Sequence, residues 1–242
     1  MTATYVLVHG AWHGGWCWRP VAERMRAVGH RVLTPTLPGF ADGDDPAAHG
    51  LDDVIDFVAT AIETQDLSDV VLVGHSWGGY VVAGAAPRVR SRLRKLVFWS
   101  AFVPADGAAL YDEVPPETQE LFTTLARESG TNSVSLPFEL WRDAFIQDAA
   151  ELVQRLTHGL LVPQPMQYNT TAVRELEPDR LGIAAAYLLG AEDLTMPEGD
   201  AGWRRFAARL GVSPTVIPGS HELFFTQPGA LAQALLAEGC EP

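Results

Sequence analysis

The sequence VVLVGHSWGG, residues 70–79, joins an apolar run to a turn and decides the fold class. Val70–Val73 are four consecutive branched apolar residues, which is typical of a strand buried on both faces of a parallel sheet. Gly74 and Gly78 then flank the three residues that contain Ser76. Because glycine has no Cβ, its backbone enters tight turns that other residues avoid. We therefore predict a sharp strand-to-helix turn that raises Ser76 above the carboxyl edge of a sheet.

Strand-length apolar runs alternate with helix-length amphipathic stretches along the chain. This alternation predicts an α/β fold, with a mostly parallel central sheet covered by helices on both faces. The predicted strands are Ala3–Val8, Arg31–Thr36, Val70–Val73, Lys95–Ser100, Ile183–Leu189 and Thr215–Ile217. The predicted helices around them are Pro20–Val28, Asp52–Gln65 with Asp52 as its cap, Gly79–Val89, Pro197–Leu210 and Pro228–Leu236.

Residues 104–181 interrupt this alternation. The segment has no convincing strand, but it contains helical patches at Glu117–Arg127 and Glu139–Leu156 that prolines interrupt. We predict a helical cap, residues 104–181, inserted between two strands of a single domain that spans residues 1–242.

The composition is ordinary for a soluble globular enzyme, with 47% apolar and 19% charged residues. The formal charge of −13 disfavours nucleic acid and anionic membranes as partners. Two cysteines, Cys17 and Cys240, do not make a disulfide framework, so the cytoplasm is the predicted location. The apolar run Ile183–Leu189 is too short to span a bilayer. The oligomeric state stays open, with a homodimer as the candidate assembly.

A serine hydroxyl attacks a carbonyl only with the help of a base, usually a histidine that an acid orients. His221, in the segment PGSHE, follows the last predicted strand, so its loop is expected over the same sheet edge as Ser76. His75 is next to Ser76 in a turn that should point the two side chains apart. His9 and His13 lie in a glycine-rich loop without the glutamate and helix of a zinc site, so no metal is predicted. The predicted base is His221.

Two aspartates compete to be the acid. Asp193, in the segment GAED, directly follows the strand Ile183–Leu189, and Asp106 follows the strand Lys95–Ser100. We favour Asp193 because it stands at the strand end, and Asp106 stays the alternative.

The oxyanion that forms when serine attacks a carbonyl needs N–H donors. The backbone N–H of Trp77, the residue after the serine, is one candidate. The loop HGAWHGGW, residues 9–16, offers the N–H of Ala11 as the other, since its glycines allow close approach to a substrate.

The stretches VLVHGAWHGGW at 6–16, GHRV at 29–32 and GHSWGG at 74–79 resemble the α/β-hydrolase superfamily. The similarity is greatest to the branch of plant methylesterases and hydroxynitrile lyases with its bacterial relatives. AFVP at 101–104 and LVPQP at 161–165 also resemble that branch, so the resemblance covers most of the chain. It implies the α/β-hydrolase fold, an esterase-like triad of Ser76, Asp193 and His221 under a helical cap, and no cofactor.

Two departures from the lyases affect the expected activity. The lyases have threonine where Gly10 stands and lysine where Glu222 follows the base, and those residues handle the nitrile group. Their absence disfavours lyase activity. Trp77 also replaces a smaller apolar residue, which keeps the N–H donor and narrows the pocket.

Aromatic side chains are candidates for the pocket walls, although core packing explains them equally well. They are Trp12, Phe122, Trp141 and Phe145, with Trp77 and Phe138. We predict a serine hydrolase that cleaves a small apolar or aromatic carboxylic ester, lactone or thioester through an acyl-enzyme. Two alternatives stay open: cleavage or rearrangement of a C–C bond by the same triad, and ligand reception without catalysis.

Overall fold

The computed structural model of the chain describes residues 2–173 and 182–240. Their central element is a six-stranded parallel sheet. The strand order is β2-β1-β3-β4-β7-β8, and every neighbouring pair runs parallel. The strands are β1 (Thr4–Val8), β2 (Arg31–Leu33), β3 (Val70–His75), β4 (Leu93–Trp99), β7 (Ala184–Gly190) and β8 (Thr215–Ile217). The predicted fold class and strands are confirmed, although β2, at the sheet edge, is shorter than expected.

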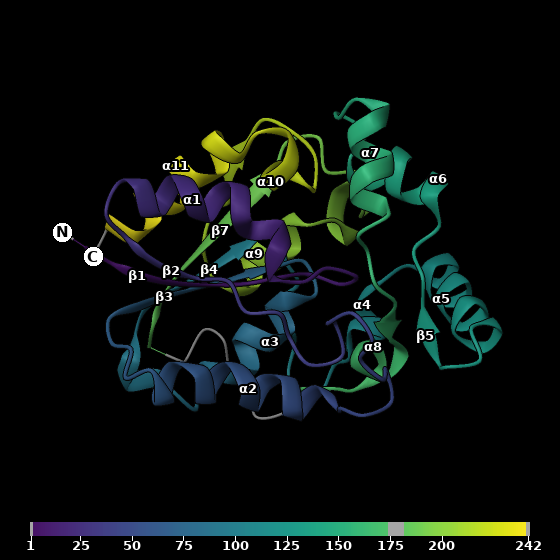
Figure 1. Cartoon of the computed structure of the whole chain (residues 1–242), viewed down its shortest axis with the longest axis horizontal. Helices are drawn as coiled ribbons and strands as arrows, with labels where there is room; N and C mark the ends of the chain where they lie inside the picture. The colour runs from purple at the N-terminus through teal and green to yellow at the C-terminus, as the bar shows by residue number, and fades with distance from the viewer. Residues whose placement is uncertain (1, 174–181, 241–242) are drawn as a thin grey trace.

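Both faces of the sheet are covered, and β3 shows why its sequence is apolar throughout. Val70 and Leu72 belong to the core on the side of α2 and α3, whereas Val71 and Val73 belong to the core on the side of α1 and α11. Successive side chains of a strand point to opposite faces, so a strand between two helical layers has no polar face. Figure 1 shows the two layers. The covering helices are α1 (Arg19–Ala27), α2 (Leu51–Thr64), α3 (Gly78–Ala85), α9 (Arg204–Arg209), α10 (Leu223–Thr226) and α11 (Pro228–Cys240).

The start of α2 differs from the prediction by its capping residue. Gly50 is the N-cap, and the Asp53 carboxylate accepts the N–H of Gly50 at 2.8 Å. The prediction that Asp52 caps the helix is therefore wrong. An acidic residue in the first turn still satisfies a free backbone donor there.

The strand order creates a crevice beside Ser76. The chain runs from β1 outward to β2 and then returns to β3 on the other side of β1. In parallel sheets the connections after two such strands diverge, and ligands bind at the carboxyl edge between them. The loop after β1 and the turn after β3 therefore border the same crevice.

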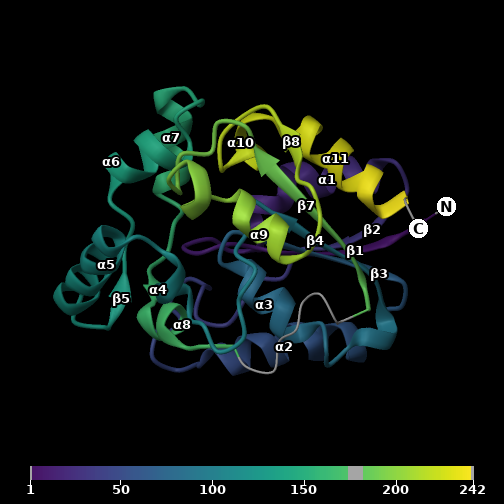
Figure 2. The same ribbon diagram turned by 180° about the vertical axis from the view of Figure 1, so that it is seen from behind.

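The described residues between β4 and β7, called here the inserted segment, lie beyond the carboxyl ends of the strands. Figures 1 and 2 show this segment at the end of the molecule opposite the two termini. Its elements are α4 (Leu110–Glu113), α5 (Pro116–Glu128), β5 (Ser133–Val134), α6 (Phe138–Leu140), a π-helical turn (Trp141–Phe145), α7 (Glu151–His158), β6 (Gln164–Pro165) and α8 (Met166–Thr170).

Two expectations about the inserted segment need correction. It does contain strands, because β5 and β6 pair antiparallel. The expected helix at 139–156 is also interrupted: α6 and the π-helical turn form its first part, and α7 begins only at Glu151. Residues 174–181, the expected end of the cap, lie outside the described residues.

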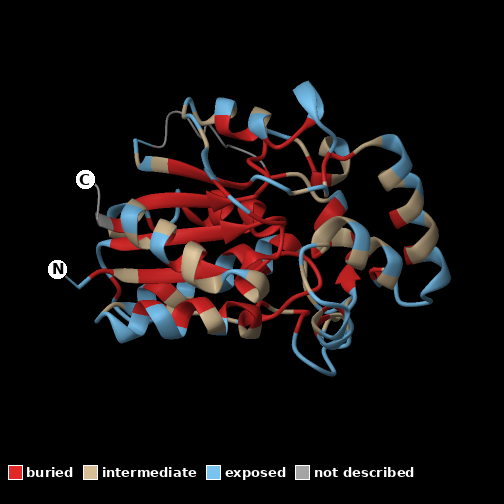
Figure 3. Ribbon diagram, turned by 90° about the horizontal axis from the view of Figure 1, so that it is seen from above, coloured by how far each residue is buried: buried red, intermediate tan, exposed pale blue. Residues whose placement is uncertain are grey.

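Burial follows the layers. In Figure 3 the strands are buried along most of their length, and exposed residues gather on the outer surfaces of the helices. Within the part of the chain that the structure describes, none of the helices has the length and apolar character needed to cross a bilayer.

Candidate active site

The turn after β3 holds Ser76 at the carboxyl edge of the sheet. β3 ends at His75 and α3 begins at Gly78, so two residues join the strand to the helix. Ser76 has a φ of 51°, a left-handed conformation that costs a residue with a side chain about 1–3 kcal/mol. A Cβ on Gly78 would lie only 2.5 Å from the carbonyl oxygen of His9, so a larger residue would push this helix start away from the neighbouring loop. The turn is strained, and close packing holds it.

Asp193 and His221 are hydrogen-bonded to each other. Asp193 lies three residues after the end of β7, and His221 lies in the loop between β8 and α10. His221 Nδ1 is 2.6 Å from Asp193 Oδ2, and each side chain is about 1% exposed. Since a carboxylate only accepts, His221 donates through Nδ1 and leaves Nε2 free to act as a base. Asp106, the alternative acid, is exposed and does not line the cavity formed by the described residues.

Thr195 supports Asp193 and was not identified from the sequence. Its hydroxyl and its backbone N–H both donate to Asp193 Oδ1, at 2.5 and 3.0 Å. Burial alone would raise the pKa of the Asp193 carboxyl, but the charge and hydrogen bond of His221 and the bonds from Thr195 bring that pKa below its ordinary value. A Thr two residues after an Asp is the available sequence signal, because an Asp side chain often accepts the N–H two positions later.

Aromatic rings fix the orientation of the His221 imidazole. Trp203 stacks on it with 5.5 Å between ring centroids, and Phe145 meets it edge-on at 5.4 Å. The ring of His75 lies behind it at 4.5 Å. The imidazole is therefore held by packing as well as by Asp193.

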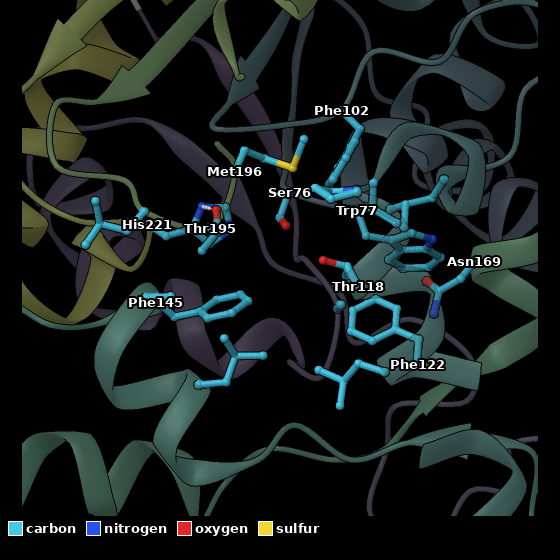
Figure 4. Close-up of a pocket in the computed structure, with 18 of the residues that line it drawn as sticks. Ser76, Trp77, Phe102, Thr118, Phe122, Phe145, Asn169, Thr195, Met196 and His221 are labelled. Carbon is cyan, nitrogen blue, oxygen red and sulfur yellow. Dashed lines mark hydrogen bonds between the residues drawn. The ribbon is translucent and has the colours of Figure 1, made fainter. Parts of the chain in front are cut away.

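Ser76 and His221 face one cavity. Figure 4 shows the Ser76 side chain pointing into the space that His221 and Phe145 border on one side and Trp77 and Phe122 on the other. Within the described residues the Ser76 hydroxyl makes no hydrogen bond to His221. Such contacts in enzymes without substrate are often long and tighten on binding, so the shared cavity is compatible with proton transfer between the two groups.

Two of the residues that line this cavity have a backbone N–H without a partner among the described residues. Ala11, in the loop after β1, and Trp77, after Ser76, both line it. Neither N–H donates to any other group in residues 2–173 and 182–240. Free backbone donors beside a nucleophile are the requirement for stabilising an oxyanion.

Hydrogen bonds hold the loop after β1 rigid. His9 Nε2 accepts the N–H of Leu37 at 3.0 Å, so its proton is on Nδ1, which donates to the Gly10 carbonyl at 2.8 Å. Burial lowers the pKa of His9 to about 4, which keeps the ring neutral and this pattern intact. The indole N–H of Trp12 donates to the carbonyl of Val134 at 2.8 Å and ties the loop to β5.

The cavity has a volume of about 480 Å³, and mostly apolar side chains line it. Four of the predicted pocket residues, Trp12, Trp77, Phe122 and Phe145, are among the lining residues, whereas Phe138 is not. The sequence did not single out several others, among them Met196 and Trp203 near the base and Asn169 from α8. Asn169 is far in sequence from Met196 and Trp203, which lie in the connection after β7, and no local pattern brings the three together.

The structure places Trp141 away from the cavity, contrary to the prediction. Its side chain is fully buried and its indole N–H donates to the carbonyl of Gln154 at 3.0 Å. Its ring packs against His13 and Phe145, with centroid distances of 5.7 and 6.0 Å. Trp141 is a core residue of the inserted segment.

The backbone at Gly10 leaves no room for the threonine of the lyases. A Cβ at this position would lie 2.8 Å from His75 Nδ1 and 2.9 Å from the Cβ of Ser76. A side chain there would press on the serine itself, so this arrangement favours glycine.

Three buried groups near the base are of metal-ligating types. Ligand atoms of His75, His221 and Glu222 lie within 4.8 Å of one another. Because Nδ1 of His221 is hydrogen-bonded to Asp193, a metal could bind His221 only through Nε2, the atom that would act as the base. We therefore do not assign these residues as metal ligands.

Comparisons with known proteins identify the family of the chain. Residues 5–234 match the model of the alpha/beta hydrolase family. A carbendazim hydrolyzing esterase from Nocardioides sp. is 46% identical over 126 residues, which cover 50% of this chain and 52% of that protein. Methylesterase 1 of Arabidopsis thaliana is 36% identical over 108 residues, which cover 41% and 40%. The matched stretches of the chain thus span about half of the length of these relatives, or less.

One of the solved structures that are similar to this chain over nearly its whole length is an extracellular alpha/beta-hydrolase from a Paenibacillus species, described as sharing structural and functional homology with tobacco salicylic acid binding protein 2. It is 30% identical, covers 98% of both chains and superposes with a TM-score of 0.93.

Proposed function

This chain belongs to the alpha/beta hydrolase family, and on that premise we propose that it hydrolyses small carboxylic esters through an acyl-enzyme on Ser76. The observation that carries the proposal is the 2.6 Å hydrogen bond between Asp193 and His221, beside a serine on a strained turn. A nucleophile, a base and an orienting acid at one cavity are the parts that acyl transfer needs.

The reaction proceeds in two halves. His221 Nε2 takes the proton of the Ser76 hydroxyl as its oxygen attacks the ester carbonyl, and Asp193 stabilises the imidazolium. The N–H groups of Ala11 and Trp77 donate to the oxyanion. His221 then gives the proton to the leaving alkoxide, and the alcohol departs. Water, deprotonated by the same imidazole, hydrolyses the acyl-enzyme and restores Ser76.

The cavity restricts the substrate class. Its volume of about 480 Å³ is in the lower part of the usual range for small-molecule sites, and its walls are aromatic and aliphatic. Small esters with an apolar or aromatic group fit this chemistry. The inserted segment acts as a cap that excludes water from the acyl-enzyme. Methyl esters and carbendazim belong in the first substrate panel, because the relatives are named for them.

The cytoplasmic location and the homodimer stay predictions. One similar structure is an extracellular protein, so the family does not fix the compartment.

A fluorophosphonate probe tests the proposal. We expect one adduct per chain, mapped by peptide mass to Ser76, and loss of turnover on the ester panel in proportion to labelling. Ser68→Ala, which changes an exposed serine, is the matched control and should label and turn over like the parent. Labelling elsewhere, or full turnover after Ser76 is modified, would contradict the proposal. Ligand binding without turnover of any ester would favour the receptor function instead.

A further inference from the structure

Glu222 is a buried ionisable side chain that the ester-hydrolysis mechanism does not use. It directly follows His221, it is 0% exposed, and within the described residues neither carboxyl oxygen accepts a hydrogen bond. A carboxylate enclosed without a donor is strongly destabilised. Burial, together with the negative charges of Asp193 and Asp148, raises the pKa of Glu222 well above its ordinary value. Both the enclosure and these neighbouring charges therefore favour the neutral, protonated form of the side chain.

His13 presents the acceptor for that proton. Its Nδ1 lies 2.7 Å from the carbonyl oxygen of Ala11, and since a carbonyl only accepts, Nδ1 carries the hydrogen. Burial lowers the pKa of His13 to about 3, so the ring is neutral and its Nε2 is a lone-pair acceptor. Nε2 lies 3.5 Å from Glu222 Oε2. A carboxylate facing this lone pair would be repelled, whereas a carboxylic acid donates to it.

The surroundings keep water away from this contact. The ring of His13 has Trp16, Trp141 and Phe224 within 6 Å between centroids. In such an enclosure a hydrogen bond is stronger than in water, and its loss is harder to compensate.

We propose that Glu222, as a neutral acid, and His13 form a positioning pair that fixes the oxyanion loop to the loop of the base. His13 donates a hydrogen bond to the carbonyl of Ala11, a residue that lines the cavity. Glu222 is the next residue in the chain after His221. The pair thus sets the distance between the oxyanion donor and the base. The inference rests on the proposed serine mechanism.

Ionisation of Glu222 at alkaline pH breaks the pair. The carboxylate then faces the Nε2 lone pair of His13 and adds a negative charge beside Asp193 and His221. Repulsion between the carboxylate and His13 loosens the oxyanion loop. The added negative charge favours the protonated form of the base, so both effects lower the rate. The titratable groups around Glu222 come from several elements: His13 and Cys17 after β1, His75 on β3, Asp148 before α7, Asp193 after β7, and His221.

Two substitutions separate this role from plain packing. Glu222→Gln keeps a neutral donor, because its amide N–H can bond to His13 Nε2, and should retain the neutral-pH kcat of the parent. Glu222→Leu fills the space without a donor. It should lower kcat roughly 10- to 100-fold with a smaller change in KM, because a loosened oxyanion donor costs less than a missing one. Glu192→Gln removes an exposed carboxylate near Asp193 and should behave as the parent.

The pH profile is the deciding measurement. The kcat of the parent should fall on the alkaline side, Glu222→Gln should stay level there, and Glu192→Gln should follow the parent. Equal losses in the Gln and Leu variants, or an alkaline fall that persists in Glu222→Gln, would overturn the inference. Histidine ¹⁵N shifts give a readout without turnover: His13 should hold its proton on Nδ1, with its Nε2 signal displaced in Glu222→Leu and close to the parent in Glu222→Gln. If Ser76 takes no probe and these shifts still behave so, the pair stands and the esterase proposal fails.

Discussion

The sheet edge and the inserted segment both line the cavity, but they position their side chains in different ways. At the sheet edge, Ser76 and Asp193 follow within three residues of the ends of β3 and β7, strands buried for most of their length. In the inserted segment, Phe122 and Phe145 reach the cavity from helices that contact little of the sheet. Pairing between strand backbones positions the side chains at the sheet edge, whereas packing between side chains positions those of the inserted segment. The sheet edge should therefore determine whether reaction occurs, and the inserted segment should determine which substrate reacts.

The largest effect is expected at the centre of the sheet edge. Ser76→Ala removes the nucleophile and should lower kcat by roughly 10⁴- to 10⁶-fold, because the rest of a triad cannot replace it. Turnover of a chromogenic ester and circular dichroism of the folded protein provide the measurement. Unchanged turnover in a folded variant would exclude a covalent mechanism and remove the distinction between the two regions.

The next effect concerns the acid. Asparagine at position 193 can turn its amide N–H₂ toward the His221 ring and favour the wrong tautomer, so Asp193→Asn should lower kcat by roughly 10³- to 10⁴-fold in a folded protein. Asp106→Asn is the matched change at the exposed alternative and should have little effect. A large loss of kcat in Asp106→Asn with little loss in Asp193→Asn would instead identify Asp106, after β4, as the acid.

Sequence patterns located the sheet edge because its rules are local. A buried strand followed by a turn predicts where a side chain will stand. Ser76 and His221 line one cavity, and Asp193 is hydrogen-bonded to His221. Thr195 was missed because its role depends on the orientation of Asp193. Glu222 was noted only as a departure from the lyases, since its contact with His13 joins loops far apart in the chain.

The inserted segment could not be predicted to the same depth, and its π-helical turn shows the reason. Trp141 and Phe145 were both candidates for the pocket walls as aromatic residues, and they are four residues apart, which in a regular α-helix places two side chains on one face. The helix is irregular there, and only Phe145 lines the cavity. The two-residue strands β5 and β6 were missed because two residues carry no periodicity.

This difference predicts separate effects for the two aromatic residues. Trp141→Ala deletes a fully buried indole and should lower the free energy of unfolding by about 3–5 kcal/mol, measured by urea denaturation. Its ratio of kcat/KM between bulky and small esters should equal that of the parent. A changed ratio with unchanged stability would place Trp141 back at the substrate, as the sequence predicted.

Phe145→Ala should give the smallest effect and the most specific one. Its ring lines the cavity, meets His221 edge-on and lies 5.7 Å from the ring of Trp12, so its removal enlarges the space next to the reacting carbonyl. An added or removed apolar wall changes discrimination between substrates by about 1–3 kcal/mol, so the kcat/KM ratio of bulky to small esters should rise at least about tenfold. Phe138→Ala is the matched control, because that ring packs under Arg155 and beside His158 and does not line the described cavity. It should leave the ratio unchanged. If Phe145→Ala lowers kcat/KM equally for every ester, its ring serves only to hold His221, and specificity is set at the sheet edge as well.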